Sequence, residues 1–279
     1  MKLKMREGVV DFSSPAVMGE LDIKSFASAE AALQAAEEMQ ELGASFIEVG
    51  ISIEDGYADK DEELKLIVPA VKAMSAELAA YIAVTTIHPE VMEAAVAAGA
   101  DLIIDPNALR AAGAVETIAR LQVPVCLVFD MHTIFEEKTD PAGLVSEFLY
   151  ERIDACLNAG ISRSRILIDP TVGRRAPVEF ALKMMGRLNT FKSFALPVTI
   201  SVPRLLPYKD PYCNEHVTVA AALAIFGVEN GVSIIRTPKV EDITLAIDTW
   251  QACTRSARPF RLTKLIARRF LRKKDKNEI

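Results

Sequence analysis

The sequence predicts a (β/α)8 TIM barrel over residues 1–258 and a basic helical extension over residues 259–279. The main observation is a pattern that occurs four times: a helical stretch ends on a glycine, and a short apolar run follows and stops at a charged residue. Glycine just past a helix takes the left-handed conformation that ends it, and the run that follows is long enough only for a buried strand. The glycines are 56, 61 and 71 residues apart, or about two βα units each, and they are Gly43, Gly99, Gly160 and Gly231. A length of 279 residues suits one barrel of about 250 residues plus an appendage.

Short apolar runs rich in β-forming residues are expected as eight barrel strands. In chain order they are Gly8–Phe12, Ser45–Val49, Tyr81–Val84, Leu102–Ile104, Val123–Phe129, Ile166–Ile168, Val198–Val202 and Ser233–Arg236. Eight alternations of strand and helix with short connections favour closure into a barrel over an open doubly wound sheet, which is the alternative. The chain has neither Gly-x-Gly-x-x-Gly after the first strand nor a phosphate-binding Gly-x4-Gly-Lys-Ser/Thr motif.

Helices are expected between these strands. The first opens at a serine, a good capping residue, and continues through Ala, Glu and Gln, which are good helix formers. The expected helices are Ser25–Leu42, Glu62–Ala80, His88–Ala98, Ala108–Leu121, Gly143–Ala159, Val178–Phe191, His216–Gly227 and Val240–Ala257.

Composition narrows the class of protein. Hydrophobic residues make up 51% of the chain, which is ample for a large core, but no apolar run reaches the roughly 18 residues that a membrane span needs. The N-terminus lacks the apolar core of a signal peptide. The four cysteines show no Cys-x-x-Cys spacing, so we expect a reduced cytoplasmic protein without a zinc site.

The net charge of −6 is unevenly distributed. Residues 254–279 contain ten Lys and Arg and two Asp and Glu, a net charge of +8, which leaves 22 basic against 36 acidic residues, or −14, in the rest of the chain. Within the tail, apolar residues recur at helical spacing among the basic ones. Such a helix can dock on the acidic barrel, on a partner protein or on an anionic membrane surface, and docking on its own barrel or a solvated end is favoured. No regular alternation of aromatic and basic residues accompanies the charge, so nucleic acid is not an expected partner.

Charged residues end the four repeated strands, at the place where parallel α/β folds carry their chemistry. We expect these residues around one mouth of the barrel, and they are Glu48, Asp105, Asp169 and Arg236. Three longer connections also leave carboxyl ends and are expected to shape a site, with surface insertions as the alternative. They span residues 13–24, 130–141 and 203–215.

Asp169 lies at the end of a buried apolar run and directly before a turn. A carboxylate in that place can accept two hydrogen bonds from the edge of an amino-pyrimidine ring. The alternative is an aspartate that only caps the turn. Asp130 and His132 follow the fifth strand and could bind a metal or move a proton, but a solvent-facing pair is the favoured interpretation.

Several segments of the chain form a recognisable series, and they are Gly8–Ser13, Phe46–Gly50, Ile82–Thr86, Gly99–Asp105, Ile166–Gly173 and Ile234–Arg236. In their joint order and spacing they resemble the dihydropteroate synthases, the pterin-binding barrels of folate synthesis. The resemblance runs from about Gly8 to Trp250.

The resemblance also shows departures at family site positions. Asp11 stands where the family has an asparagine near the metal and diphosphate, and Thr85 stands for a third-strand aspartate. A pterin-binding asparagine is Ile104 here, and the lysine that contacts the pterin is Leu205, whereas Arg236 is kept.

A pterin-type ligand in the barrel mouth is what the resemblance implies. The expected ligand-binding residues are Asp11, Glu48, Thr85, Asp105, Asp169, Arg204 and Arg236. Arg174 and Arg175 are a candidate anion clamp, with surface arginines as the alternative. Asp11 is the candidate metal ligand, for Mg²⁺ if a diphosphate is the substrate, and no other cofactor is expected.

The replacements also bear on activity. Diphosphate departure needs positive charge or hydrogen-bond donors near the leaving oxygens, and Leu205 and Asp55 stand where the resemblance expects that charge. We therefore expect a divergent dihydropteroate-synthase-like protein without ordinary synthase activity, and a homodimer. The alternatives are an active transferase of folate or pterin metabolism with another co-substrate, and a pterin-dependent methyltransferase-like protein. Asp169→Asn is expected to abolish ligand binding and to leave the melting temperature nearly unchanged.

Overall fold

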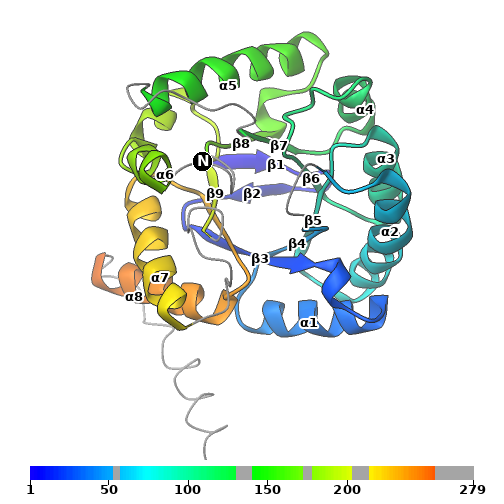
Figure 1. Ribbon diagram of the computed structural model, residues 1–279, viewed down its shortest axis with the longest axis horizontal. Coiled ribbons are helices and arrows are strands. Elements are labelled where there is room, and N and C mark those ends of the chain that lie inside the picture. The colour runs from blue at the N-terminus through cyan, green and yellow to red at the C-terminus, as the bar shows by residue number, and fades with distance from the viewer. Residues whose placement is uncertain (53–56, 130–139, 172–177, 203–213, 255–279) are drawn as a thin grey trace, which may run out of the picture.

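The computed structural model describes residues 1–52, 57–129, 140–171, 178–202 and 214–254. Eight parallel strands lie inside a ring of helices (Figure 1). Around the sheet they follow the order β8 (Ile166–Asp169), β7 (Val125–Val128), β6 (Leu102–Asp105), β5 (Tyr81–Thr85), β4 (Phe46–Gly50), β3 (Ala16–Asp22), β10 (Ile234–Thr237) and β9 (Thr199–Ser201). A parallel bridge between Ile168 and Val198 joins the two outer strands, so the sheet closes on itself. The predicted (β/α)8 barrel is confirmed.

Helices follow the strands and cover the outside of the barrel (Figure 1). They are α1 (Ala29–Glu41), α2 (Lys60–Glu77), α3 (Pro89–Ala98), α4 (Ala114–Leu121), α5 (Pro141–Asn158), α6 (Val178–Met185), α7 (Asn214–Glu229) and α8 (Val240–Thr254), with short 3-10 helices η1 (Ile23–Ser25), η2 (Arg163–Arg165) and η3 (Leu188–Phe194). None of the helices in the described ranges is long and apolar enough to cross a bilayer.

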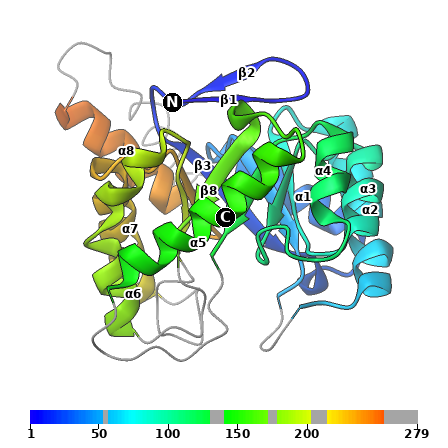
Figure 2. The ribbon, with the colours of Figure 1, turned by 90° about the horizontal axis from the view of Figure 1, so that it is seen from above.

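The prediction that Gly8–Phe12 is the first barrel strand is wrong. This segment contains β2 (Val9–Asp11), which pairs antiparallel with β1 (Lys2–Lys4) in a separate hairpin. The hairpin crosses one end of the barrel (Figures 1 and 2), and β3 takes the expected place in the sheet. Both segments are short apolar runs, and pattern alone does not say which of them pairs with the rest of the sheet.

The hairpin closes the amino-terminal end of the barrel. Arg6 Nη1 donates to the carbonyl of Val96, 3.3 Å away, near the end of the helix that precedes β6. The rings of Phe12 and Phe46 stack at the start of β4. Leu3 and Met5 are completely buried and belong to the cluster that fills the lower barrel.

Glycine closes the helices as the repeat predicted. Gly99 follows α3 with a φ of 116° and its amide donates to the carbonyl of Val96. Only Gly adopts this conformation without strain. At the other end of a helix, Ser28 caps α1 by accepting a hydrogen bond from the Ala31 amide at 3.3 Å, three residues after the serine expected to begin it.

The tail from residue 255 to 279 lies outside the described residues, as do the positions of Asp130 and His132. The division of the chain at residue 258 therefore stays a prediction.

Candidate functional site

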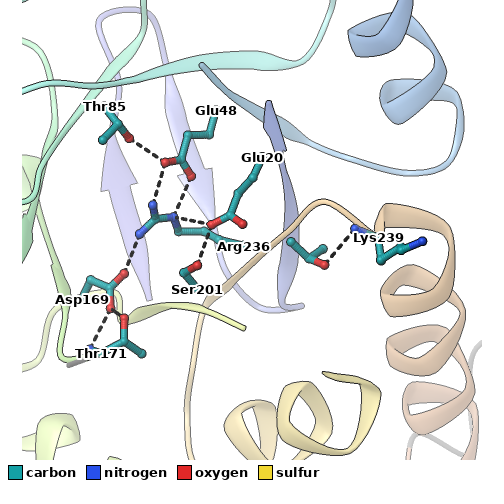
Figure 3. Close-up of polar contacts among 9 residues, drawn as sticks. Glu20, Glu48, Thr85, Asp169, Thr171, Ser201, Arg236 and Lys239 are labelled. Atoms are coloured by element: carbon teal, nitrogen blue, oxygen red, sulfur yellow. Dashed lines mark hydrogen bonds and ion pairs between the residues drawn. The ribbon is translucent and has the colours of Figure 1, made fainter. Parts of the chain in front are cut away.

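Strand alternation places the site one layer above the apolar filling of the barrel. Met18, Phe46, Ala83, Leu167 and Ile234 fill the interior at the amino-terminal side. Because successive side chains point to opposite faces of a strand, the residues two positions further on also point inward. These residues are Glu20, Glu48, Thr85, Asp169 and Arg236, and Figure 3 shows them converging.

Arg236 is the centre of this layer, and its side chain has no exposed surface. Its Nε donates to Glu48 Oε2 at 2.8 Å and its Nη2 donates to Glu48 Oε1 at 2.6 Å, so the two planar groups meet edge to edge. Its Nη1 donates to Asp169 Oδ2 at 2.7 Å. This arrangement is the strong bidentate kind of charge-assisted hydrogen bonding, with a second carboxylate on the remaining side.

Glu20 lies in the same layer as Arg236, on the neighbouring strand β3. Its Oε1 is 3.7 Å from Arg236 Nε, and it accepts a hydrogen bond from the hydroxyl of Ser201 at 2.7 Å. Strand register explains the meeting, since Glu20 pairs with Glu48 and Arg236 pairs with Ser201 across neighbouring parallel strands. Thr85 completes the layer by donating its hydroxyl to Glu48 Oε1 at 2.6 Å.

Asp169 has protein partners at both oxygens. While Oδ2 accepts from Arg236, Oδ1 accepts from the amide of Thr171 at 2.9 Å and from the hydroxyl of the same residue. The carboxylate is completely buried. Asp169 therefore caps the turn after its strand, as one of the two sequence-based interpretations expected, and it also faces the inside of the barrel. Its binding of a ligand edge stays a prediction.

The electrostatics of the layer keep Arg236 charged. Burial would lower the pKa of Arg236, but the neighbouring charges of Glu48, Asp169 and Glu20 raise it well above its ordinary value. Three carboxylates surround one guanidinium among the described residues, so this group of four carries an excess of negative charge.

Asp105 is not part of this cluster. It lies on the face of β6 that is turned away from the barrel interior. Its carboxylate accepts hydrogen bonds from the amides of Asn107 at 2.6 Å and Leu109 at 3.0 Å. These bonds hold a turn in which Ala108 and Leu109 have positive φ angles of 49° and 59°. Arg152 supports the same turn through the carbonyls of those two residues.

A second buried carboxylate, Glu63, lies near Asp105 outside the barrel wall. It accepts a hydrogen bond from the hydroxyl of Thr86, whose oxygen also accepts from the His88 amide at 3.1 Å. Burial raises the pKa of Glu63 to about 7, and burial likewise raises the pKa of Asp105 to about 7. The charge of Glu63 makes a smaller contribution to the raised pKa of Asp105.

Comparison with known proteins identifies the family. The family model described as "Pterin binding enzyme" matches residues 21–238. The dihydropteroate synthase of Haemophilus influenzae is 30% identical over 274 residues, covering 90% of this chain and 98% of that protein. The dihydropteroate synthase of Escherichia coli is also 30% identical, covering 96% of its own length. This chain belongs to the dihydropteroate synthase family of pterin-binding enzymes.

Solved structures agree with this assignment. The dihydropteroate synthase of Xanthomonas albilineans in complex with 7,8-dihydropteroate superposes with a TM-score of 0.82 at 29% identity, covering 93% of this chain and 100% of that chain. A Yersinia pestis enzyme with a pterine-sulfa conjugate superposes with a TM-score of 0.83 at 30% identity. The family fold therefore extends over nearly the whole chain.

Of the expected family site residues, the structure brings Glu48, Thr85, Asp169 and Arg236 together. Arg204 and the pair Arg174 and Arg175 lie outside the described residues, and their roles stay predictions.

Asp11 lies elsewhere, on the hairpin at the amino-terminal end, where its Oδ1 accepts from the Ser13 amide at 3.0 Å. The correction follows from the misplaced first strand: the first barrel strand ends at Asp22, not at Asp11. Asp22 is thus the residue at the mouth position that Asp11 was expected to fill.

The position of Asp11 does not fit a metal site at the mouth of the barrel. A Mg²⁺ ion at the mouth needs oxygen ligands there, and Asp11 is at the other end of the barrel. Asp22 is at the correct end, but its Oδ1 accepts hydrogen bonds from the amides of Lys24 at 3.2 Å and Ser52 at 3.3 Å. The described ranges contain no group of three or more His, Cys, Asp or Glu side chains that could hold a metal ion.

Sequence reasoning missed Glu20 and Ser201. The signal for Glu20 was available in the alternation of Met18, Glu20 and Asp22, which puts three side chains on one face of a strand. The prediction of Gly8–Phe12 as the first strand leaves this segment in a connection and so hides the alternation.

Proposed function

We propose that this member of the dihydropteroate synthase family binds a pterin-type ligand at the carboxyl ends of the barrel strands and does not carry out ordinary dihydropteroate synthesis. Support for the ligand comes from the family assignment and from the solved relative that holds 7,8-dihydropteroate. The polar layer around Arg236 lies at the end of the barrel where such folds bind their ligands.

The observation that carries the second half of the proposal is the burial of Arg236. A diphosphate leaving group is stabilised by cations or donors that point at its oxygens. The guanidinium of Arg236 instead donates to Glu48 and Asp169 and has no exposed surface. The extra carboxylate of Glu20 adds repulsion against an anionic group approaching this layer.

The apolar replacements support the same conclusion. Ile104 lies inside the barrel among apolar side chains and offers no hydrogen bond. Thr85, at the end of the neighbouring strand, already donates its hydroxyl hydrogen to Glu48. Each hydrogen bond lost to a site built for it weakens binding by about 1–3 kcal/mol.

Two measurements on the 279-residue chain test the proposal. Isothermal titration with pterin is expected to show saturable binding, because the family fold is kept and Asp169 and Arg236 face the inside of the barrel. Incubation with dihydropterin diphosphate and p-aminobenzoate is expected to give no dihydropteroate at ordinary enzyme rates, with the Escherichia coli enzyme as the positive control. Turnover of about 1 per second or faster would overturn the loss of synthase activity. Absence of pterin binding would overturn the ligand assignment.

A further inference from the structure

A buried cation lies at the amino-terminal end of the barrel, away from the mouth. Arg165 is the last residue of η2 and directly precedes β8, and it is only 9% exposed. The backbone of Ile166 is already extended, so strand alternation turns Arg165 to the same side as Leu167, which belongs to the cluster inside the barrel. The guanidinium therefore lies at the end of the barrel opposite to the polar layer around Arg236.

The hairpin covers this part of the barrel. Strand β1 lies against η2, and Leu3 of β1 is completely buried in the interior cluster that also contains Leu167. Figure 2 shows the hairpin across the end of the barrel. Arg165 is thus enclosed between the first strand of the hairpin and the amino end of β8.

One donor atom of Arg165 lacks an acceptor. Its Nη1 is buried and has no hydrogen-bond partner among the described residues. A guanidinium is always charged and can only donate, so burial without an acceptor is unfavourable. Arg236 is equally buried but donates to Glu48 and Asp169. Since nearly all buried polar groups in native proteins are paired, the orphaned Nη1 indicates a partner from outside the chain, such as an ion.

The charges on the two elements around Arg165 are positive. Residues 2–4 and 163–165 carry four basic side chains and no acidic one, and the basic ones are Lys2, Lys4, Arg163 and Arg165. Asp11 faces Lys2 across the hairpin, and its Oδ1 accepts a hydrogen bond from the amide of Ser13. No carboxylate on β1 or η2 compensates for Arg165, so the local charge attracts an anion.

We propose that the amino-terminal end of the barrel holds a binding site for a small oxyanion of the phosphate type, to which Arg165 donates from Nη1. The donors of a guanidinium match the oxygens of phosphate in spacing and direction. Lys2 and Lys4 are exposed on β1 and add positive charge beside the site. The burial of Arg165 restricts the ligand to a small free anion. This site lies at the other end of the barrel from the mouth, so the proposed function does not depend on it.

The test is isothermal titration of inorganic phosphate, at ionic strength balanced with sodium chloride, into three 279-residue proteins: the unchanged chain, Arg165→Gln and Arg187→Gln. The unchanged chain is expected to bind phosphate saturably. Arg165→Gln removes the charge and the paired donors, and is expected to weaken binding by at least about tenfold. Arg187→Gln makes the same change at an exposed position and is expected to keep the affinity.

Hydrogen exchange locates the bound anion. Phosphate is expected to slow amide exchange in peptides 1–12 and 160–168 of the unchanged chain and of Arg187→Gln, but not of Arg165→Gln. Slower exchange only in peptides from the mouth would overturn the site. Glycerol 3-phosphate is expected to bind at least about tenfold more weakly than phosphate, and equal binding would overturn the restriction to a free anion.

The double variant Lys2→Gln/Lys4→Gln serves if Arg165→Gln does not fold. Both lysines are exposed, so the double variant is expected to keep the melting temperature measured without phosphate and to bind phosphate about two- to tenfold more weakly. Unchanged affinity in Arg165→Gln, or in the double variant if only that one folds, would overturn the site. Absence of phosphate binding by the unchanged chain would overturn it as well, and either result would leave the proposed function intact.

Discussion

Arg236 and Asp169 form a pair that stabilises the fold as well as the site. The guanidinium is completely buried, and Asp169→Asn replaces one of the carboxylates that accept its hydrogen bonds by a neutral amide, while Glu48 stays in place. The structure therefore changes the sequence-based expectation that Asp169→Asn has little effect on the melting temperature. We now expect this substitution to lower the free energy of unfolding by about 1–3 kcal/mol.

Chemical denaturation of Asp169→Asn checks this expectation. The matched control is Asp154→Asn, the same change at an exposed position of α5, which is expected to alter stability by no more than about 0.5 kcal/mol. Equal stability of the two variants would show that Arg236 does not depend on Asp169.

Glu63 and Asp105 make stability depend on pH. Both have folded-state pKa values near 7, above their ordinary values of 4.5 and 3.8, because burial disfavours the charged form. Between the ordinary and the folded pKa values, the folded protein holds more protons than the unfolded chain, so stability falls as pH rises. We expect a loss on the order of 3 kcal/mol per group between about pH 5 and pH 7.5.

Glu63→Gln is expected to flatten part of this pH dependence, because a neutral amide does not titrate. Urea denaturation at several pH values measures the slope. Glu77→Gln, at an exposed position of the same helix α2, is expected to keep the slope of the unchanged chain. An identical slope in Glu63→Gln would mean that Glu63 does not titrate in this range.

At the scale of elements, the β1–β2 hairpin acts as a plug for the amino-terminal end of the barrel. Leu3 is completely buried there, whereas Val9 on the partner strand is 57% exposed. Leu3→Ala is expected to destabilise the protein by about 2–5 kcal/mol through the cavity it leaves. Val9→Ala is expected to cost no more than about 0.5 kcal/mol. Thermal denaturation of the two variants distinguishes a plug from a loosely attached hairpin, for which both changes would be mild.

The end of α3 shows how tightly the helices pack where a glycine turns the chain. A Cβ at Gly99 would lie 2.4 Å from Ser75 Cβ, whereas a Cβ at Gly160 would meet nothing within 4 Å. Both glycines have positive φ angles, so both alanine variants carry backbone strain of about 1–2 kcal/mol. Only Gly99→Ala adds a clash, and its melting temperature is expected to be the lower of the two. Equal melting temperatures would indicate that Ser75 moves aside freely.

At the scale of the whole molecule, charge separates the chain into an acidic barrel and a basic end. Truncation after Arg258 removes eight basic and two acidic residues. We expect the truncated barrel to keep the melting temperature of the whole chain. At low salt, we expect its association with itself or with anionic vesicles to differ from that of the whole chain. The difference is expected to disappear at 1 M salt, where the Debye length is about 3 Å. Sedimentation velocity and vesicle binding measure it, and identical behaviour at every salt concentration would indicate a solvated end without a docking role.

The sequence by itself determined the parallel barrel. The hydrophobic period, the helix-ending glycines and the chain length can be recognised without knowing which segments contact one another. Charged strand ends likewise predicted Glu48, Asp169 and Arg236 at one mouth. Only the tertiary structure decided which of two apolar runs enters the sheet, and with it the change from Asp11 to Asp22 at the mouth. It also decided that the Asp105 side chain stabilises the turn after its own strand and that Glu20 lies beside Arg236. The reason is that a shift of one residue along a strand moves a side chain from the barrel interior to the face covered by helices. Pairing and parity depend on partners distant in the chain, which a local pattern does not specify.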